Sequence, residues 1–174
     1  MTTYHERIGM ALICLFFFGA VILPRVQAGF FETQLYFESP NTVINPDVSG
    51  RQFHWPLTAF GISQGFSGYH PGMDLTDPAG TPVFAAAGGT VIYTGWDLSG
   101  YGRHVIIRHD GDIETLYAHL SKIDVRDGQD VAKSTKIGEV GATGHATGNH
   151  LHFEVHVRGT PVNPLDVLPE LSKS

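Results

Sequence analysis

Histidine is the residue type in this sequence that most clearly suggests chemistry. The chain holds ten histidines in 174 residues, and three short segments place histidine beside a second useful group. These segments are His70-Pro71-Gly72-Met73-Asp74, Tyr117-Ala118-His119-Leu120 and His150-Leu151-His152. Imidazole and carboxylate groups are common zinc ligands, and a neutral imidazole accepts protons near neutral pH. The three segments are therefore candidates for a metal site or for proton transfer.

The segment 150–157 alternates strictly between apolar and polar residues. In a strand, side chains at i and i+2 point the same way, about 6.5 to 7 Å apart. One face would then carry His150 and His152 side by side, one for a metal and one for the reacting group. The alternative is a solvent-exposed polar face with incidental histidines. The apolar face would hold Leu151, Phe153, Val155 and Val157, and the polar face would add Glu154 and His156.

The segment 70–74 reads as a loop that enters a strand. Pro71 disfavours the helical conformation for His70, and Gly72 permits a tight reversal. This geometry lets His70 and Asp74 converge without the helix of an H-E-x-x-H motif. His119 stands at the end of an apolar strand. Taken singly, His70 could be a turn residue and His119 a hydrogen-bonded core histidine.

The elements that must position these residues are short strands. Runs rich in β-branched and aromatic residues, bounded by turn residues, lie at 89–95, 104–109, 114–120, 136–141 and 150–157. The pair Asp110-Gly111 between two of these runs predicts a hairpin turn. No window of 12 or more residues has a sustained helical period. The fold class we predict is all-β, or nearly so, with antiparallel strands and little helix.

Composition indicates one globular domain that does not bind nucleic acid. The chain is 42% hydrophobic and 16% charged, which excludes a disordered chain. Seventeen acidic and 11 basic residues give a net charge of -6, with no basic cluster to neutralise phosphates. We expect a lead-in segment at 29–50, the domain at 51–168, a tail at 169–174, and a monomer.

The first 28 residues are predicted to be a signal peptide. The run 8–23 is apolar and uncharged, but it is shorter than the about 20 residues of a membrane span. Cleavage after Ala28 would place the protein in the periplasm, cell envelope or extracellular space. It would also remove Cys14, the one cysteine, so a metal must be held by His, Asp or Glu. The alternative is an uncleaved membrane tether through 8–23, flanked by Arg25.

Three separated motifs resemble one known family. H-P-G-M-D at 70–74, Y-A-H-L-S at 117–121 and G-A-T-G-H-A-T-G-N-H-L-H-F-E at 141–154 are similar to the M23 (lysostaphin/LytM-type) zinc metallopeptidases. The resemblance runs from about Trp55 to Pro164 and keeps the motif order. It implies an antiparallel β-sheet groove of the duplicated hybrid motif type, with Zn²⁺ at its floor. It also implies cleavage of bacterial peptidoglycan peptides.

The resemblance also implies a role for each site residue. His70, Asp74 and His152 would be the zinc ligands, and His119 and His150 the catalytic pair. Two imidazoles and one carboxylate leave a fourth position open for water, as in catalytic zinc sites. Because no helix supplies a glutamate base, one neutral histidine must take the proton and the other can stabilise the oxyanion. Which histidine does which stays open.

Other residues carry weaker expectations. Tyr101 could form a wall of the groove, but packing in a turn is the preferred interpretation. His145 is expected to be an exposed loop residue, and Ser134 stands at a turn where the family often has glycine. The remaining histidines are expected to be structural or at the surface, and they are His54, His104, His109 and His156.

Three functions compete for this sequence. The first is a zinc endopeptidase that cleaves peptidoglycan cross-links. The second is a catalytically inactive relative that activates another cell-wall hydrolase, although such relatives usually lack site residues and all five are present here. The third is a biotinyl/lipoyl-like carrier, suggested by the G-T-V and D-G-Q-D-V patterns. Export makes the carrier implausible, so the enzyme is preferred.

Overall fold

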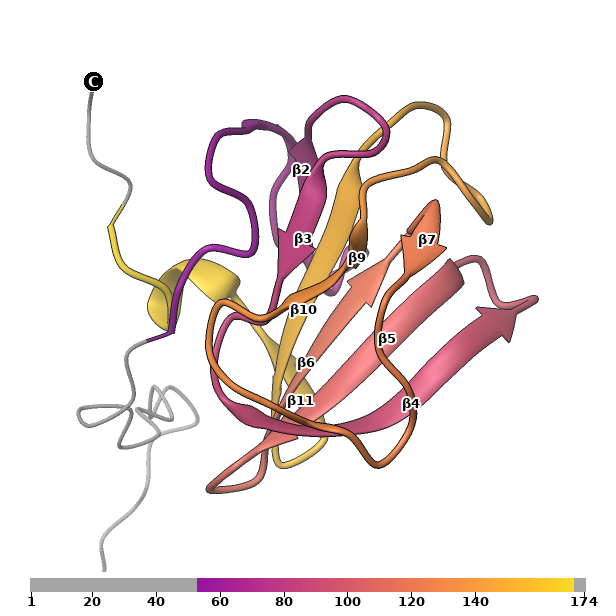
Figure 1. The fold of residues 1–174 in the computed structure, drawn as a ribbon. Helices are drawn as coiled ribbons and strands as arrows, with labels where there is room; N and C mark the ends of the chain where they lie inside the picture. The colour runs from indigo at the N-terminus through magenta and orange to yellow at the C-terminus, as the bar shows by residue number, and fades with distance from the viewer. Residues whose placement is uncertain (1–52, 171–174) are drawn as a thin grey trace, which may run out of the picture. The chain divides into compact units, whose positions relative to one another are not determined.

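β-Strands dominate the part of the chain that the structure, a computed structural model, describes, which is residues 53–170. The prediction of a β-rich fold with little helix is confirmed for this range, where one short 3₁₀ turn is the helical element (Figure 1). The elements are β1 (Gly61–Gln64), β2 (Met73–Thr76), β3 (Pro82–Phe84), β4 (Gly89–Asp97), β5 (Gly102–His109), β6 (Ile113–Ala118), β7 (Lys122–Ile123), β8 (Asp130–Val131), β9 (Lys136–Glu139), β10 (Leu151–Val157), β11 (Thr160–Val162) and η1 (Pro164–Asp166).

The strands form two sheets, and their pairs are antiparallel. The large sheet has the order β1-β2-β10-β6-β5-β4-β8, with β11 also paired to β10. The small sheet has the order β3-β9-β7. In Figure 1 the long strands β4, β5, β6 and β10 run side by side through the molecule. The five strands expected from the sequence are all present, with ends shifted by up to two residues.

The hairpin between β5 and β6 shows how the turn chemistry works. Gly111 has a φ of 70° and Asp112 a φ of 58°, both in the left-handed region. Glycine adopts this region without strain, and aspartate tolerates it better than most residues. The predicted turn at Asp110-Gly111 is therefore confirmed, and the pair His109↔Ile113 closes the hairpin.

β10 is the strand on which the site depends, because it is paired on both edges. Its residues 151–153 pair with β2, and its residues 152–157 pair with β6. His152 consequently lies opposite Asp74 on one side and Ala118 on the other. The predicted alternation holds for the apolar face, where Leu151, Phe153 and Val155 have no exposed surface. The other face is also covered, since His152 is 5% exposed and Glu154 fully buried.

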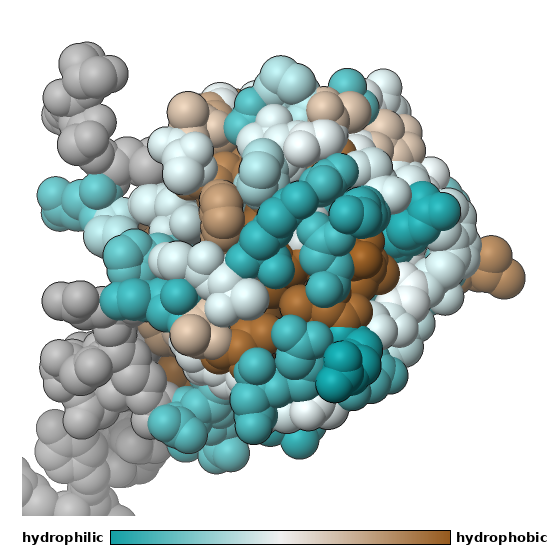
Figure 2. All heavy atoms as spheres, viewed as in Figure 1, coloured by the Kyte–Doolittle hydropathy of each residue, from teal (hydrophilic) through white to brown (hydrophobic). Residues whose placement is uncertain are grey.

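The core lies between strands of both sheets. Burying one such large apolar side chain contributes about 1.5 to 3 kcal/mol, so the core supplies the main stabilising energy. Figure 2 shows hydrophilic residues over much of the viewed face, with hydrophobic ones in its middle. A hydrophobic protrusion lies on the right, where Figure 1 shows the end of the β4–β5 hairpin. Fully buried members of the core include Leu75, Val83, Val91, Val105, Ile107, Tyr117, Ile137, Leu151 and Phe153.

Several predictions fall outside the described residues. The signal peptide or tether at 1–28 and the lead-in at 29–50 lie there, as does most of the tail at 169–174. Within 53–170, no helix is long and apolar enough to cross a membrane. The boundaries of the domain at 51–168 stay a prediction.

Candidate metal and catalytic site

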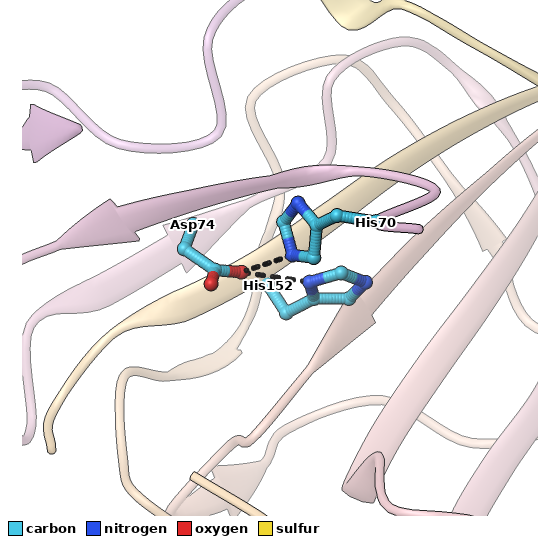
Figure 3. Close-up of side chains that lie close together, drawn as sticks. All are labelled: His70, Asp74 and His152. Atoms are coloured by element: carbon cyan, nitrogen blue, oxygen red, sulfur yellow. Dashed lines mark hydrogen bonds and ion pairs between the residues drawn. The ribbon is translucent and has the colours of Figure 1, made fainter. Parts of the chain in front are cut away.

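Three candidate ligands come together although 78 residues of chain separate two of them. His152 Nδ1 lies 2.7 Å from Asp74 Oδ1, and His70 Nε2 lies 3.1 Å from the same oxygen. One ligand atom from each of the three residues lies within 4.8 Å of the others. Figure 3 shows both imidazoles turned toward the carboxylate of Asp74. Such a group of two imidazoles and one carboxylate can hold a metal ion.

Each of the three side chains is held by a different local device. Asp74 lies on β2 and His152 on β10, so the register of the two strands brings them together. His70 comes from the loop before β2, where a bridge to Ser67 and a contact between His70 Nδ1 and Gly65 O, 3.0 Å apart, fix it. Gly72 lets this loop pass close to β10, because a Cβ there would lie 3.1 Å from His152 Cε1.

A buried carboxylate, Glu154, contacts the ring nitrogen of His152 that faces away from Asp74. Glu154 is fully buried, and its oxygens lie 2.8 Å from His152 Nε2 and 2.7 Å from the hydroxyl of Tyr101. His156 Nε2 contacts the other oxygen of Glu154. The sequence interpretation placed Glu154 and His156 on a polar face but gave neither a role at the site. Tyr101 was expected to pack in a turn, and it does so against His104 while its hydroxyl reaches the site.

The two remaining candidate residues flank the ligand group. His119 follows the end of β6 and His150 precedes β10, and their ring centroids are 4.6 Å apart. His119 Nδ1 donates to the carbonyl of Thr143 at 2.8 Å, and His150 Nδ1 to that of Gly148 at 2.9 Å. In both rings this leaves Nε2 as the nitrogen that can accept a proton. His150 Nε2 lies 3.7 Å from Asp74 Oδ1.

Backbone strain marks the position of His119. Its φ is 62°, in the left-handed region that residues other than glycine rarely adopt. Two backbone hydrogen bonds hold it there, from His119 N to Tyr101 O and from Thr143 N to His119 O. Strain of this kind is often found at functional sites, where the surrounding structure imposes it.

Burial and charge shift the pKa values of the site in the metal-free protein. Burial lowers the pKa of His119, which favours its neutral form. Burial opposes the charge of His152, but Asp74 and Glu154 outweigh it and raise the pKa of His152 to about 9. Burial alone would raise the pKa of Glu154, but its three hydrogen bonds lower it to about 2. The hydrogen bond from His152 likewise outweighs burial and lowers the pKa of Asp74.

A groove of about 530 Å³ opens over these residues. All five residues predicted from the motifs line it, so the structure brings the whole set together. The rim is formed by loops, and Tyr69 on one of them is fully exposed. His145 is exposed as expected, and it also lines the groove. The other rim and wall residues are Gln64, Pro71, Ser99, Gly100, Tyr101 and Thr147.

The remaining histidines have structural contacts or lie at the surface, as expected. His104 stacks on Tyr93 and is buried. His109 is also buried, with its ring nitrogens 2.8 Å from Gly88 O and Thr115 Oγ1. His54 is exposed. Ser134 has a φ of 65°, in the left-handed region that glycine adopts without strain.

Known proteins similar to this chain share its central region. The model of peptidase family M23 matches residues 68–164. A DD-carboxypeptidase/endopeptidase, Mpg of Neisseria meningitidis, is 46% identical over 108 residues, which are 60% of this chain and 25% of that protein. The murein hydrolase activator NlpD of Escherichia coli is 37% identical over 123 residues, 68% of this chain and 31% of the activator. The chain thus matches less than a third of either relative.

Solved structures agree with the sequence relatives. A zinc containing peptidase from Vibrio cholerae has a TM-score of 0.64 and 36% identity, covering 70% of this chain and 41% of its own. The antimicrobial peptidase lysostaphin from Staphylococcus simulans has a TM-score of 0.59 and 32% identity, and the match covers 63% of this chain and 49% of the lysostaphin chain. The predicted antiparallel fold of the lysostaphin type is confirmed.

Proposed function

The chain belongs to peptidase family M23, and from this premise we propose that it is a zinc-dependent endopeptidase that hydrolyses peptide cross-links of bacterial peptidoglycan. One observation carries the proposal. His70, Asp74 and His152 converge at the floor of a groove, with two more histidines directly beside them. We assign His70, Asp74 and His152 as the zinc ligands and His119 and His150 as the catalytic pair.

The donor set fits zinc. Two neutral imidazoles and one carboxylate match the ligands of catalytic zinc sites, which keep a further position open. The ring nitrogen of His70 that faces away from Asp74, Nδ1, lies 3.0 Å from the Gly65 carbonyl oxygen. The corresponding nitrogen of His152, Nε2, lies 2.8 Å from Glu154 Oε1. Outer contacts of this type orient histidines that bind metals. Zinc, when bound, would polarise a peptide carbonyl and lower the pKa of a water molecule.

The catalytic pair would handle the protons. His119 and His150 each use Nδ1 to donate to a backbone carbonyl, so each can accept a proton at Nε2. One of them takes the proton from the attacking water and later passes it to the leaving amine. The other, when protonated, donates a hydrogen bond to the oxygen of the tetrahedral intermediate. Their closeness, with centroids 4.6 Å apart, lets both reach one scissile bond.

The groove suits an extended peptide chain. It is open, and most of its rim comes from three loops, which contain Tyr69, Ser99 and Thr147. Peptidoglycan cross-links are flexible peptides, and the Mpg relative is named an endopeptidase. Because this substrate lies in the cell envelope, we propose that the protein is exported there, by either the cleaved signal or the tether at 1–28.

A second candidate function follows from the NlpD relative, which is named a murein hydrolase activator. In that role the chain would bind and activate a separate hydrolase without cutting peptide bonds. The presence of all five site residues around one groove favours the enzyme.

Digestion of purified peptidoglycan by the full-length chain tests the proposal. With zinc, we expect loss of turbidity and release of fragments whose masses identify the bond that is cut. A chelator should stop the reaction, and fresh zinc should restore it. His152→Ala should lose zinc and activity together, whereas His54→Ala, outside the groove, should keep both. If the chain binds zinc, cleaves no peptidoglycan and accelerates a separate cell-wall hydrolase, the enzyme proposal is refuted and the activator function is supported.

A further inference from the structure

Glu154 is a charged group in an unusually enclosed place. Its side chain has no exposed surface, and it lies on the central strand β10. A buried carboxylate is costly unless hydrogen bonds satisfy it. Here three donors surround it, from His152, Tyr101 and His156. Two of the three donors contact the same oxygen, Oε1, which faces the candidate ligand His152.

The contact with His152 decides which ring nitrogen can bind a metal. His152 Nε2 lies 2.8 Å from Glu154 Oε1, and Nδ1 lies 2.7 Å from Asp74 Oδ1. Without a metal, a carboxylate faces each ring nitrogen, so both nitrogens can donate. A metal bound by Nδ1 and Asp74 would take the place of the Nδ1 proton, and Glu154 would then accept the hydrogen bond from the proton that stays on Nε2. The lone pair of Nδ1 then points toward Asp74 and His70. Without an acceptor at Nε2, the ring would be free to adopt the tautomer that cannot bind metal through Nδ1.

Tyr101 keeps Glu154 in place and connects it to the other wall of the groove. Its hydroxyl donates to Glu154 Oε1 at 2.7 Å, across 53 positions of sequence. Its ring is 5.7 Å from that of His152, centroid to centroid. Its backbone carbonyl accepts from the amide of His119 at 2.9 Å. One residue in the turn before β5 therefore contacts both a candidate ligand and the strained backbone of a candidate catalytic residue.

We propose that Glu154, held by Tyr101, is a positioning residue that fixes the tautomer and ring orientation of His152 for metal binding. The inference rests on the proposed role of His152 as a ligand. It predicts that loss of the acceptor at position 154 weakens metal binding even though Glu154 never touches the metal. Loss of the acceptors behind metal-binding histidines typically weakens binding by about 10 to 100-fold.

The test measures the dissociation constant of zinc for the full-length chain by competition with a chromogenic chelator at constant pH. Glu154→Leu removes the acceptor at similar size and should weaken zinc binding by about 10 to 100-fold. Glu154→Gln keeps an acceptor oxygen and should recover most of that loss. Tyr101→Phe removes one hydroxyl and should give an intermediate loss. Nitrogen-15 NMR of the zinc-loaded His152 ring should show Nε2 protonated in wild type and a mixed or altered signal in Glu154→Leu.

Glu114 supplies the matched control. It is a carboxylate on the neighbouring strand β6, directly opposite His156, and it pairs with Arg108 at the surface. Glu114→Leu and Glu114→Gln should bind zinc like wild type. If Glu154→Leu does not fold, Tyr101→Phe decides, since it removes a single oxygen atom.

Wild-type zinc affinity and ring signal in both Glu154→Leu and Tyr101→Phe would overturn the inference. Equal losses in the Glu114 variants would also overturn it, because the effect would not be specific to position 154. A wild type that binds zinc and loses it on these substitutions, yet cleaves no peptidoglycan, would refute the proposed enzyme and support the positioning role.

Discussion

At the scale of single residues, the proposed assignment separates metal binding from proton transfer. His150 Nε2 lies 3.7 Å from Asp74 Oδ1, and the ring centroid of His119 lies 5.8 Å from that of His152. We therefore expect His119→Ala and His150→Ala to keep near-stoichiometric zinc while activity falls by about 10² to 10⁴-fold. Elemental analysis beside turbidity loss measures both quantities. Loss of metal from His150→Ala but not from His152→Ala would reverse the assignment of the pair.

Thr143 is a second residue whose effect can be isolated. Its hydroxyl accepts from Arg103 N at 3.0 Å and donates to Leu120 O at 2.9 Å, and its carbonyl accepts from His119 Nδ1. Thr143→Val removes both hydrogen bonds of the hydroxyl, which should lower the free energy of unfolding by about 1 to 3 kcal/mol. It should also slow catalysis without loss of zinc, because the anchor of His119 loosens.

Denaturant unfolding and steady-state rates measure the two effects of Thr143→Val. Thr94→Val is the matched control, since the Thr94 hydroxyl bonds Asp127 at the surface. The prediction fails if both variants behave alike.

At the scale of elements, the site depends on how closely the loop before β2 approaches β10. A Cβ at Gly72 would lie 2.5 Å from Phe153 O and 2.8 Å from Glu154 Cγ. Gly72→Ala must therefore push the loop away from β10 and His70 away from His152. We expect weaker zinc binding and lower activity, measured by chelator competition and turbidity loss. Gly68→Ala, in the same loop with no atom within 4 Å of its Cβ, should change neither.

The small sheet carries a charge cluster whose contribution depends on pH. Asp124 follows β7 and lies 2.6 Å from Lys122 Nζ and 3.1 Å from Lys136 Nζ. The hydrogen bond from Lys122, and then that from Lys136, lowers the pKa of Asp124. A lowered pKa stabilises the fold above the unfolded value of about 3.9, and the effect is lost as pH falls through the folded value.

Asp124→Asn should therefore be slightly less stable than wild type at pH 7 and equal to it near pH 2. The difference should be small, because surface ion pairs contribute little, and it should shrink in high salt. Thermal unfolding at both pH values and at two salt concentrations checks it. A difference that persists at pH 2 would contradict the ion-pair account.

Sequence patterns predicted the parts of this fold that are locally encoded. The five long or motif-bearing strands and the Asp110-Gly111 turn were found because alternation and turn chemistry are local. β7 and β8 have two residues each and exist through pairing with distant strands, so no local pattern marks them. For the same reason, the sequence did not predict the contacts of Glu154 with Tyr101 and His152. Whether a polar face is covered, and which hydroxyl reaches it, depends on chain segments 53 positions away.

At the scale of the whole molecule, metal binding should stabilise the fold. The proposed ligands join a loop, β2 and β10, and β10 is paired on both edges. Zinc at 100 times its dissociation constant should add about 2.7 kcal/mol if the unfolded chain does not bind it. For a chain of this size, that corresponds to a rise in Tm of about 5 to 10 °C. Differential scanning calorimetry with zinc and with chelator measures it, and His152→Ala should show no such rise.

The division of the groove between floor and rim has a consequence for engineering new specificities. The floor residues lie on or next to paired strands, and one strand, β10, supplies both core and site side chains. The rim residues Tyr69, Ser99 and Thr147 lie in loops, and Tyr69 is fully exposed. A mutant library confined to these rim positions changes what the groove touches while leaving the strand register intact. Selection on such a library can therefore search for peptides of different sequence without sampling large numbers of unfolded variants.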